Sequence, residues 1–365
     1  MNKNADARRR ILGYDLARAL AFFGMVVVNF KLVMGASDAG PVWLVWAARL
    51  LEGRAAATFV VLAGVGVSLL SAKARREGDL QALAGARRRL LSRAAFLFVV
   101  GLLYTPIWPP DILHFYGLYL AAAAFLLNAS NRRLVGLALG LPWVFFGLLL
   151  SADYEREWDW DLLTYEGLWT PEGFIRHLFF NGFHPVLPWL SFLLVGMILG
   201  RMDIRDPANR KRVFLFGVAA TVIAEGLSFF LVRLLSIGAS TVEQAEIVAV
   251  FGTGMMPPVP LYMLAGTGVA CAVIAASAEA GLRYAEAPWL RPLLATGEMA
   301  LTLYVAHVVV GMGTLELFGR LENQTLPFAL ACAALFGVAS MLFATLWRRR
   351  FSRGPLEILL RKIAG

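Results

Sequence analysis

The sequence predicts an all-α, polytopic integral membrane protein with about ten transmembrane helices and both termini in the cytoplasm. Hydrophobic residues make up 59% of the 365 residues, 16% are charged, and the mean hydropathy is +0.67. Soluble domains average about 45–50% apolar and about 25% charged residues. The composition therefore excludes an ordinary soluble enzyme, a disordered chain and a secreted disulfide scaffold.

Ten apolar runs define the expected spans. A helix needs roughly 20 apolar residues to cross a hydrocarbon core of ~30 Å. Several runs fall slightly short of that length, so the count carries an error of one helix. We expect the whole chain, 1–365, to form one transmembrane domain. The runs lie at approximately 13–34, 53–72, 91–108, 112–128, 134–151, 183–200, 213–235, 258–278, 293–313 and 326–347.

The distribution of basic residues predicts the orientation. With the N-terminus inside, 26 of the 34 Lys and Arg lie on the cytoplasmic side and seven on the outer side, as the positive-inside rule requires. The strongly basic loop at about 73–93 is then cytoplasmic, and the acidic loop at about 152–182 faces outward. The aromatic residues of the outer loop favour an element lying at the membrane interface; a sugar-stacking lip is the alternative.

Ionisable residues inside spans are candidates for function, because each costs about 2.5–3.5 kcal/mol at a helix centre on insertion scales. In the first span, Asp15, Arg18 and Asn29 fall on one face of a 3.6-residue helix. Two interpretations have equal weight. The stripe serves a substrate, or Asp15 pairs with Arg18 near the cytoplasmic end and Asn29 bonds to another helix.

All four histidines fall in the outer half of this topology. Asp111 and His114 share a face at the start of the fourth span, where a carboxylate could orient the imidazole and raise its basicity for general base catalysis. An N-capping aspartate beside an interfacial histidine explains this pair slightly better. An interfacial position also suits His177 and His184, and His307 lies about two-thirds of the way across the ninth span.

Two carboxyl groups lie in later spans. Glu298 shares a helix face with Thr302 and lies about 180° from His307 on a straight helix. Glu225 has no local partner, and a neutral or hydrogen-bonded carboxyl is as good an interpretation as a functional role.

The basic cytoplasmic loop has two interpretations. Orientation together with anionic lipid binding is favoured; the alternative is that its arginines meet the phosphates of an acyl-CoA. We find no Walker, HExxH or GxSxG motif and no GxGxxG turn after a strand. Cys271 and Cys332 lie in apolar stretches, so neither a disulfide nor a Cys-based metal site is expected, and no metal or nucleic acid is predicted. The candidate phosphate ligands are Arg75, Arg76, Arg87, Arg88 and Arg89.

Several segments together resemble the bacterial relatives of heparan-α-glucosaminide N-acetyltransferase. The opening signature of that family is similar to RRRILGYDLARALAFFGMVVVN, its second span to EGRAAATFVVLAGVGVSLL, and its later histidine segment to DILHFYGLYL. The late spans shared with YeiB-like membrane proteins resemble NGFHPVLPWLSFLLVGMILGR and LLATGEMALTLYVAHVVV. Each motif is loose, but their order and the topology agree over most of the chain.

The resemblance implies a transmembrane acyltransferase of the bacterial inner membrane. Such a protein takes an acyl group, here an acetyl group, from cytosolic acyl-CoA as co-substrate. It delivers the group to a hydroxyl or amine of a sugar-like or lipid-linked acceptor at the outer face. The implied partners are the lipid bilayer, acyl-CoA and this acceptor, and the sequence allows for a homodimer.

The resemblance also implies site residues. Asn29 matches the active-site asparagine of the family, and Asp15 with Arg18 matches its first-helix charged pair. The lumenal enzyme of the family carries a catalytic histidine shortly after that asparagine, whereas Phe30 and Lys31 follow here. The base would then be His114 or another outer histidine.

The leading mechanism expected from these residues is acyl transfer along the first helix. His114, oriented by Asp111, would deprotonate the acceptor, and Asn29 would stabilise the developing oxyanion. The alternative is a proton-coupled small-molecule transporter or lipid flippase that uses Glu225, Glu298 and His307, although we see no clear inverted repeat. A non-catalytic membrane partner is a third hypothesis.

Overall fold

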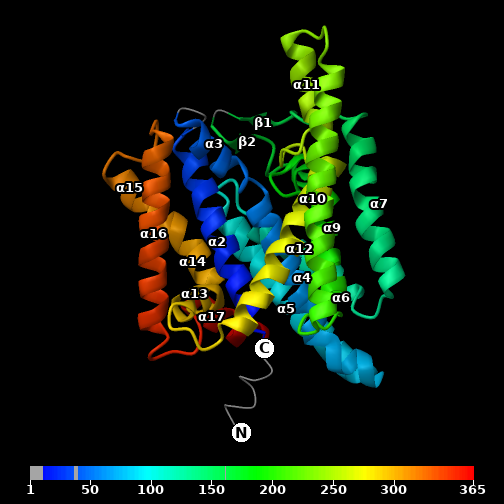
Figure 1. The fold of residues 1–365 in the computed structure, drawn as a ribbon, viewed down its shortest axis with the longest axis vertical. Coiled ribbons are helices and arrows are strands. Elements are labelled where there is room, and N and C mark those ends of the chain that lie inside the picture. Colours follow the sequence, from blue (N-terminus) through cyan, green and yellow to red (C-terminus); the bar gives the residue numbers. More distant parts are fainter. Residues whose placement is uncertain (1–10, 37–39, 161) are drawn as a thin grey trace. The chain divides into compact units, whose positions relative to one another are not determined.

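The computed structural model describes residues 11–36, 40–160 and 162–365. The expected basic N-terminal tail and Asp161 of the outer loop lie outside these residues. The described chain is built almost entirely of helices (Figure 1), and one short antiparallel hairpin is formed by β1 (Trp158–Asp159) and β2 (Thr164–Tyr165). The helices are α2 (Leu12–Val33), α3 (Val42–Arg49), α4 (Arg54–Glu77), α5 (Leu80–Tyr104), α6 (Leu113–Phe125), α7 (Asn131–Leu149), α8 (Pro171–Arg176), η1 (His177–Asn181), α9 (Val186–Leu199), α10 (Pro207–Leu235), α11 (Thr241–Phe251), α12 (Pro260–Arg283), α13 (Leu290–Glu298), α14 (Ala300–Ala306), η2 (His307–Met312), α15 (Gly313–Leu317), α16 (Leu326–Trp347) and α17 (Pro355–Ala364).

The all-α, multi-pass class is confirmed, with fewer clear spans than the ten expected. Within the described residues, seven helical segments are long and apolar enough to cross a membrane, or eight if the bent pair Pro171–Asn181 and Val186–Leu199 is one span. The expected span 112–128 corresponds to α6, which has only 13 residues. The expected span 293–313 is divided among α13, α14 and η2, because the backbone leaves the α-helical conformation at Met299.

The chain folds into two compact units whose segments alternate along the sequence. Of the described residues, unit 1 contains those up to 59, 203–217 and 269–359, and unit 2 contains those within 60–202, 218–268 and 360–365.

In unit 1, α2 is the central element and packs against α13, α14 and α16. Small residues allow the close approach. A Cβ at Gly297 of α13 would overlap the carbonyl oxygen of Asp15 and lie 3.2 Å from the nitrogen of Ala19. At the other end of α2, the Phe30 ring packs edge-on against Phe336 of α16. Glycine at the contact lets backbones approach as van der Waals packing between membrane helices requires.

In unit 2, α5 packs against α6, and α9 packs against α6 and α7. The Ser68 hydroxyl of α4 donates a hydrogen bond to the carbonyl of Met197 on α9 at 2.6 Å. Gly64 and Gly196 face each other nearby, and a Cβ on Gly64 would lie 2.9 Å from the Cα of Gly196. This pair of glycines brings the backbones of α4 and α9 into direct contact.

The loop at about 152–182, which is expected to face outward, is a folded part of unit 2. Trp158 and Trp160 stack with ring centroids 4.4 Å apart. The Asn181 amide donates to the carbonyl of Tyr154 at 2.9 Å and accepts from the Tyr165 hydroxyl at 3.0 Å. Burial raises the pKa of Tyr165 to about 12, which extends the pH range over which this hydroxyl donates into more alkaline conditions.

Candidate functional site

Asn29 and His307 meet inside unit 1. The amide nitrogen Nδ2 of Asn29 on α2 lies 2.9 Å from Nε2 of His307. His307 is buried, with 1% of its surface exposed. The other ring nitrogen, Nδ1, lies against the carbonyl oxygen of Tyr304. Because a carbonyl can only accept, Nδ1 carries the proton and Nε2 presents its lone pair to the Asn29 amide. The contact thus joins a buried basic nitrogen to an amide donor.

The backbone around His307 is unusual. His307 begins the π-helical segment η2, and His177 begins η1, so both π-helical segments of the described chain start at a histidine. π-Helical turns are rare and occur frequently at functional sites. The two histidines are therefore singled out by backbone geometry as well as by burial.

Glu357 of the C-terminal helix α17 holds the start of α14, the helix that leads to His307. Its Oε1 accepts from the backbone nitrogens of Leu301 at 2.8 Å and Thr302 at 3.1 Å, and its Oε2 accepts from the Thr302 hydroxyl. The break at Met299 exposes these N–H groups, which need a partner at any helix start. A carboxylate also suits the positive end of the helix dipole. Glu357 therefore fixes the beginning of the segment that carries His307.

Replacing Glu357 with Ala is expected to lower the thermal unfolding temperature of the purified protein. Each buried N–H left without a partner costs about 1–3 kcal/mol. Glu357→Gln retains a side-chain acceptor and should lose less. Glu286→Ala is the matched control, because Glu286 is exposed in the same unit. Equal unfolding temperatures for Glu357→Ala and Glu286→Ala would contradict the capping role.

The polar residues of the first span contact other groups of the protein, as the packing interpretation describes. The Arg18 guanidinium donates to the carboxylate of Asp15, which is 3% exposed. Asn29 bonds to another helical segment through His307. The pairing accounts for the burial of Asp15, while the Asn29 contact places that residue beside a basic nitrogen. A substrate role for Asp15 and Arg18 stays a prediction.

Asp111 and His114 form a second buried pair, in unit 2. Asp111 Oδ2 accepts from His114 Nδ1 at 3.0 Å and from the backbone nitrogen of Leu113 at 2.8 Å, and both side chains are at most 1% exposed. Asp111, which precedes the N-cap residue Ile112 rather than lying in the first turn, thus accepts from the start of α6 and orients the imidazole; a catalytic role for the pair stays a prediction. The ring nitrogen Nε2 of His114 has no hydrogen-bond partner within the described residues. A Cβ at Gly101 of α5 would lie 2.9 Å from Asp111 Oδ2, so the pair needs glycine there.

His114 belongs to a cluster of three buried histidines. Its ring stacks on that of His177 with centroids 5.6 Å apart. His184 lies before α9, packs edge-on against Trp189, and accepts a hydrogen bond on its carbonyl from the Tyr119 hydroxyl. Nδ1 of His177 and Nδ1 of His184 also lack a hydrogen-bond partner among the residues described. The cluster is aromatic and buried, as a site that excludes water requires.

The two carboxyl groups of the later spans have partners. Glu298 forms an ion pair with Arg348, which follows α16. It does not share a continuous helix with Thr302 as expected, because α13 ends at Glu298. Glu225 accepts from the Thr253 hydroxyl at 2.8 Å. Each carboxylate therefore has a polar contact within the chain.

Comparison with known families shows to which family the chain belongs. A family model described as "Heparan-alpha-glucosaminide N-acetyltransferase, catalytic" matches residues 10–234, more than half of the chain. The chain belongs to this family. A second model, described as "Protein of unknown function (DUF418)", matches residues 200–365. A search of curated proteins finds no match.

Membership in the heparan-α-glucosaminide N-acetyltransferase family confirms the resemblance seen in the sequence, and the second match supports its YeiB-like late spans. It makes the chain a multi-pass protein of a membrane acetyltransferase family. The N-acetyltransferase match contains Asn29 and His114, whereas His307 lies only in the second matched range. The Asn29–His307 contact therefore joins the two matched ranges.

The arginines that the sequence offers for acyl-CoA phosphates lie mostly on helix surfaces. Arg75 Nη2 donates to the Ser68 carbonyl at 3.2 Å and Arg76 Nε to the Ala72 carbonyl at 3.3 Å. Arg88 and Arg89 are exposed on α5. Their role toward a nucleotide in this N-acetyltransferase family member stays a prediction.

Sequence reasoning missed Glu357 and Tyr304, the two residues that hold His307 in place. Tyr304 acts through its backbone carbonyl, which no side-chain pattern reveals. Glu357 had one available signal. It lies in the first turn of a short amphipathic helix, where a carboxylate is favoured by the dipole; its partner across the fold could not be read from that position.

Proposed function

We propose that the protein transfers an acetyl group from cytosolic acetyl-CoA to a hydroxyl or amine of a sugar-like or lipid-linked acceptor at the outer face of a bacterial inner membrane. The observation that carries the proposal is the contact between Asn29 and Nε2 of His307. The resemblance assigns Asn29 to the active site and requires a histidine nearby. His307 supplies one from a distant part of the chain.

In the proposed reaction, His307 is the general base. Its Nε2 takes the proton from the acceptor hydroxyl or amine as the acceptor attacks the thioester carbonyl. The Asn29 N–H, released from Nε2, donates to the oxyanion of the tetrahedral intermediate. The intermediate collapses, the carbon–sulfur bond breaks, and the proton on Nε2 passes to the departing CoA thiolate. General base catalysis contributes about 10²–10⁴-fold and one oxyanion donor about 10²–10³-fold.

The Asp111–His114 pair is a second candidate base. Its Nδ1–H donates to a carboxylate, which leaves Nε2 as the basic nitrogen, the arrangement that general base catalysis uses. We place the reaction at His307 because Asn29 contacts that ring directly. Variants of both histidines decide between them.

The test is a reaction of the purified full chain with acetyl-CoA labelled in the acetyl group and glucosamine as acceptor. Acyl transfer predicts release of free CoA and label on the sugar, both dependent on protein. The transporter alternative predicts that a proteoliposome accumulates glucosamine without covalent change. Absence of both signals, with lipid extracts also unlabelled, would contradict the proposed function.

A further inference from the structure

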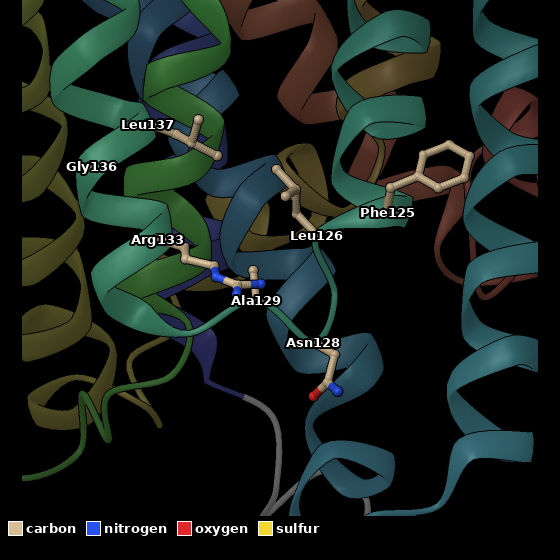
Figure 2. A pocket seen from close by; sticks show the side chains of 7 residues that line it. All are labelled: Phe125, Leu126, Asn128, Ala129, Arg133, Gly136 and Leu137. Carbon is tan, nitrogen blue, oxygen red and sulfur yellow. The ribbon is translucent and has the colours of Figure 1, made fainter.

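A pocket of about 550 Å³ lies in unit 2 where α6 passes into α7 (Figure 2). Arg133 and Leu137 reach into it from α7, and Asn128 lies on the connecting turn. A smaller hollow of about 250 Å³ shares Asn128 and adds Arg87 of α5. None of these residues belongs to the two histidine sites.

The pocket is held by hydrogen bonds to the turn that forms it. Arg201 Nη1 donates to the Ala129 carbonyl and to Asn131 Oδ1, both at 2.7 Å. Arg87 Nε donates to the carbonyl of Ala124 at 3.0 Å. Ser130 caps α7 by accepting from its backbone. Two guanidinium groups thus bind backbone carbonyls, so the turn is fixed before any ligand arrives.

Polar groups in the pocket are available for an anion. The Arg133 guanidinium and the Asn128 amide have no hydrogen-bond or ion-pair partner among the residues that the structure describes. Within the same residues, Arg87 uses only Nε in hydrogen bonding, which leaves its terminal nitrogens. A guanidinium group can bind a phosphate through two parallel N–H···O hydrogen bonds. The first turn of α7 adds the positive end of a helix dipole.

The surface beside the pocket indicates what carries the phosphate. α7 is long and apolar enough to cross a membrane, and only 17% of its most apolar window is buried. Phe125, at the pocket, is 67% exposed. A soluble phosphate or nucleotide makes no use of such a surface, whereas acyl chains cover it. The exposed apolar side chains of α7 include Val135, Leu137, Leu139, Trp143 and Val144.

We infer that this pocket binds the phosphate headgroup of an anionic phospholipid, with Arg133 and Asn128 as ligands, Arg87 adding positive charge from the adjoining hollow, and the acyl chains along the flank of α7. The basic residues place the pocket on the expected cytoplasmic side, where anionic headgroups and basic pockets between helices meet. This inference is independent of the proposed acetyl transfer.

The experiment uses the full chain in phosphatidylcholine nanodiscs doped with dioleoylphosphatidylglycerol, with retained lipid measured by native mass spectrometry. Arg133→Ala is expected to lower phosphatidylglycerol retention about fivefold, the contribution of one basic group near an anionic surface. Arg133→Lys keeps the charge but loses the paired hydrogen bonds, and should fall between. Arg132→Ala is the matched control, because it removes the same charge from the neighbouring residue outside the pocket, and should lower retention less than Arg133→Ala, which also loses the paired hydrogen bonds.

Three results would overturn the inference. Equal losses for Arg132→Ala and Arg133→Ala would indicate a diffuse surface charge. Displacement of phosphatidylglycerol by inorganic phosphate or free CoA would assign the pocket to a soluble phosphate. Equal retention of phosphatidylcholine would remove the requirement for negative charge. An unchanged unfolding temperature for each variant ensures that loss of retention reports the pocket.

Discussion

Replacing His307 with Gln is expected to lower acetyl transfer by about 10²–10⁴-fold, the usual contribution of a general base. Glutamine keeps a polar side chain of similar reach toward Asn29 but has no basic nitrogen. Loss of the proton acceptor should therefore reduce kcat and leave acetyl-CoA binding unchanged. Single-turnover acetyl transfer and thermal stabilisation by acetyl-CoA measure these two quantities separately.

The matching variant in unit 2 is His114→Gln. If acetyl transfer survives His307→Gln and is abolished by His114→Gln, the base is the Asp111–His114 pair, as the sequence first suggested. Asn29→Ala should cost about 10²–10³-fold through the lost oxyanion donor. If His307 is the base, Asn29 and His307 act in one site. Their double variant should then lose less activity than the product of the two single losses.

Local chemistry could be predicted from the sequence, and long-range pairing could not. The Asp111–His114 contact is local, because the carboxylate of Asp111, two residues before α6, accepts from the first residues of that helix. The Asn29–His307 contact joins residues 278 positions apart, and it depends on how α2 packs in unit 1. Hydropathy identified both segments as membrane helices, but it carries no information on which polar faces meet.

The same limit explains the broken ninth span. Its sequence is mostly apolar, so a continuous helix of 3.6-residue period is the expectation, with Glu298 and Thr302 on one face. In the structure the helix is interrupted at Met299, and the freed backbone N–H groups of Leu301 and Thr302 donate to Glu357. Tertiary contacts thus override an apolar pattern at one residue. The break changes which side chains share a surface.

Replacing Gly64 with Val is expected to destabilise unit 2 strongly, because the contact between α4 and α9 at this residue leaves no room for a side chain. A Cβ at Gly64 would overlap the carbonyl oxygen of Leu193 and lie 2.8 Å from the nitrogen of Met197. Both neighbours are backbone atoms, which cannot rotate away. Overpacking of this kind costs about 1–3 kcal/mol and occasionally more. The unfolding temperature in detergent, followed by tryptophan fluorescence, should fall accordingly.

Gly66→Val is the control on the same helix. A Cβ at Gly66 meets nothing within 4 Å, so the substitution adds the same side chain to α4 without a collision. A difference between the two variants therefore reports the α4–α9 contact rather than helix propensity. Equal unfolding temperatures would show that α4 and α9 do not approach so closely. Since α9 begins two residues after His184, Gly64→Val should also disturb the histidine cluster, whereas Gly66→Val should leave it intact.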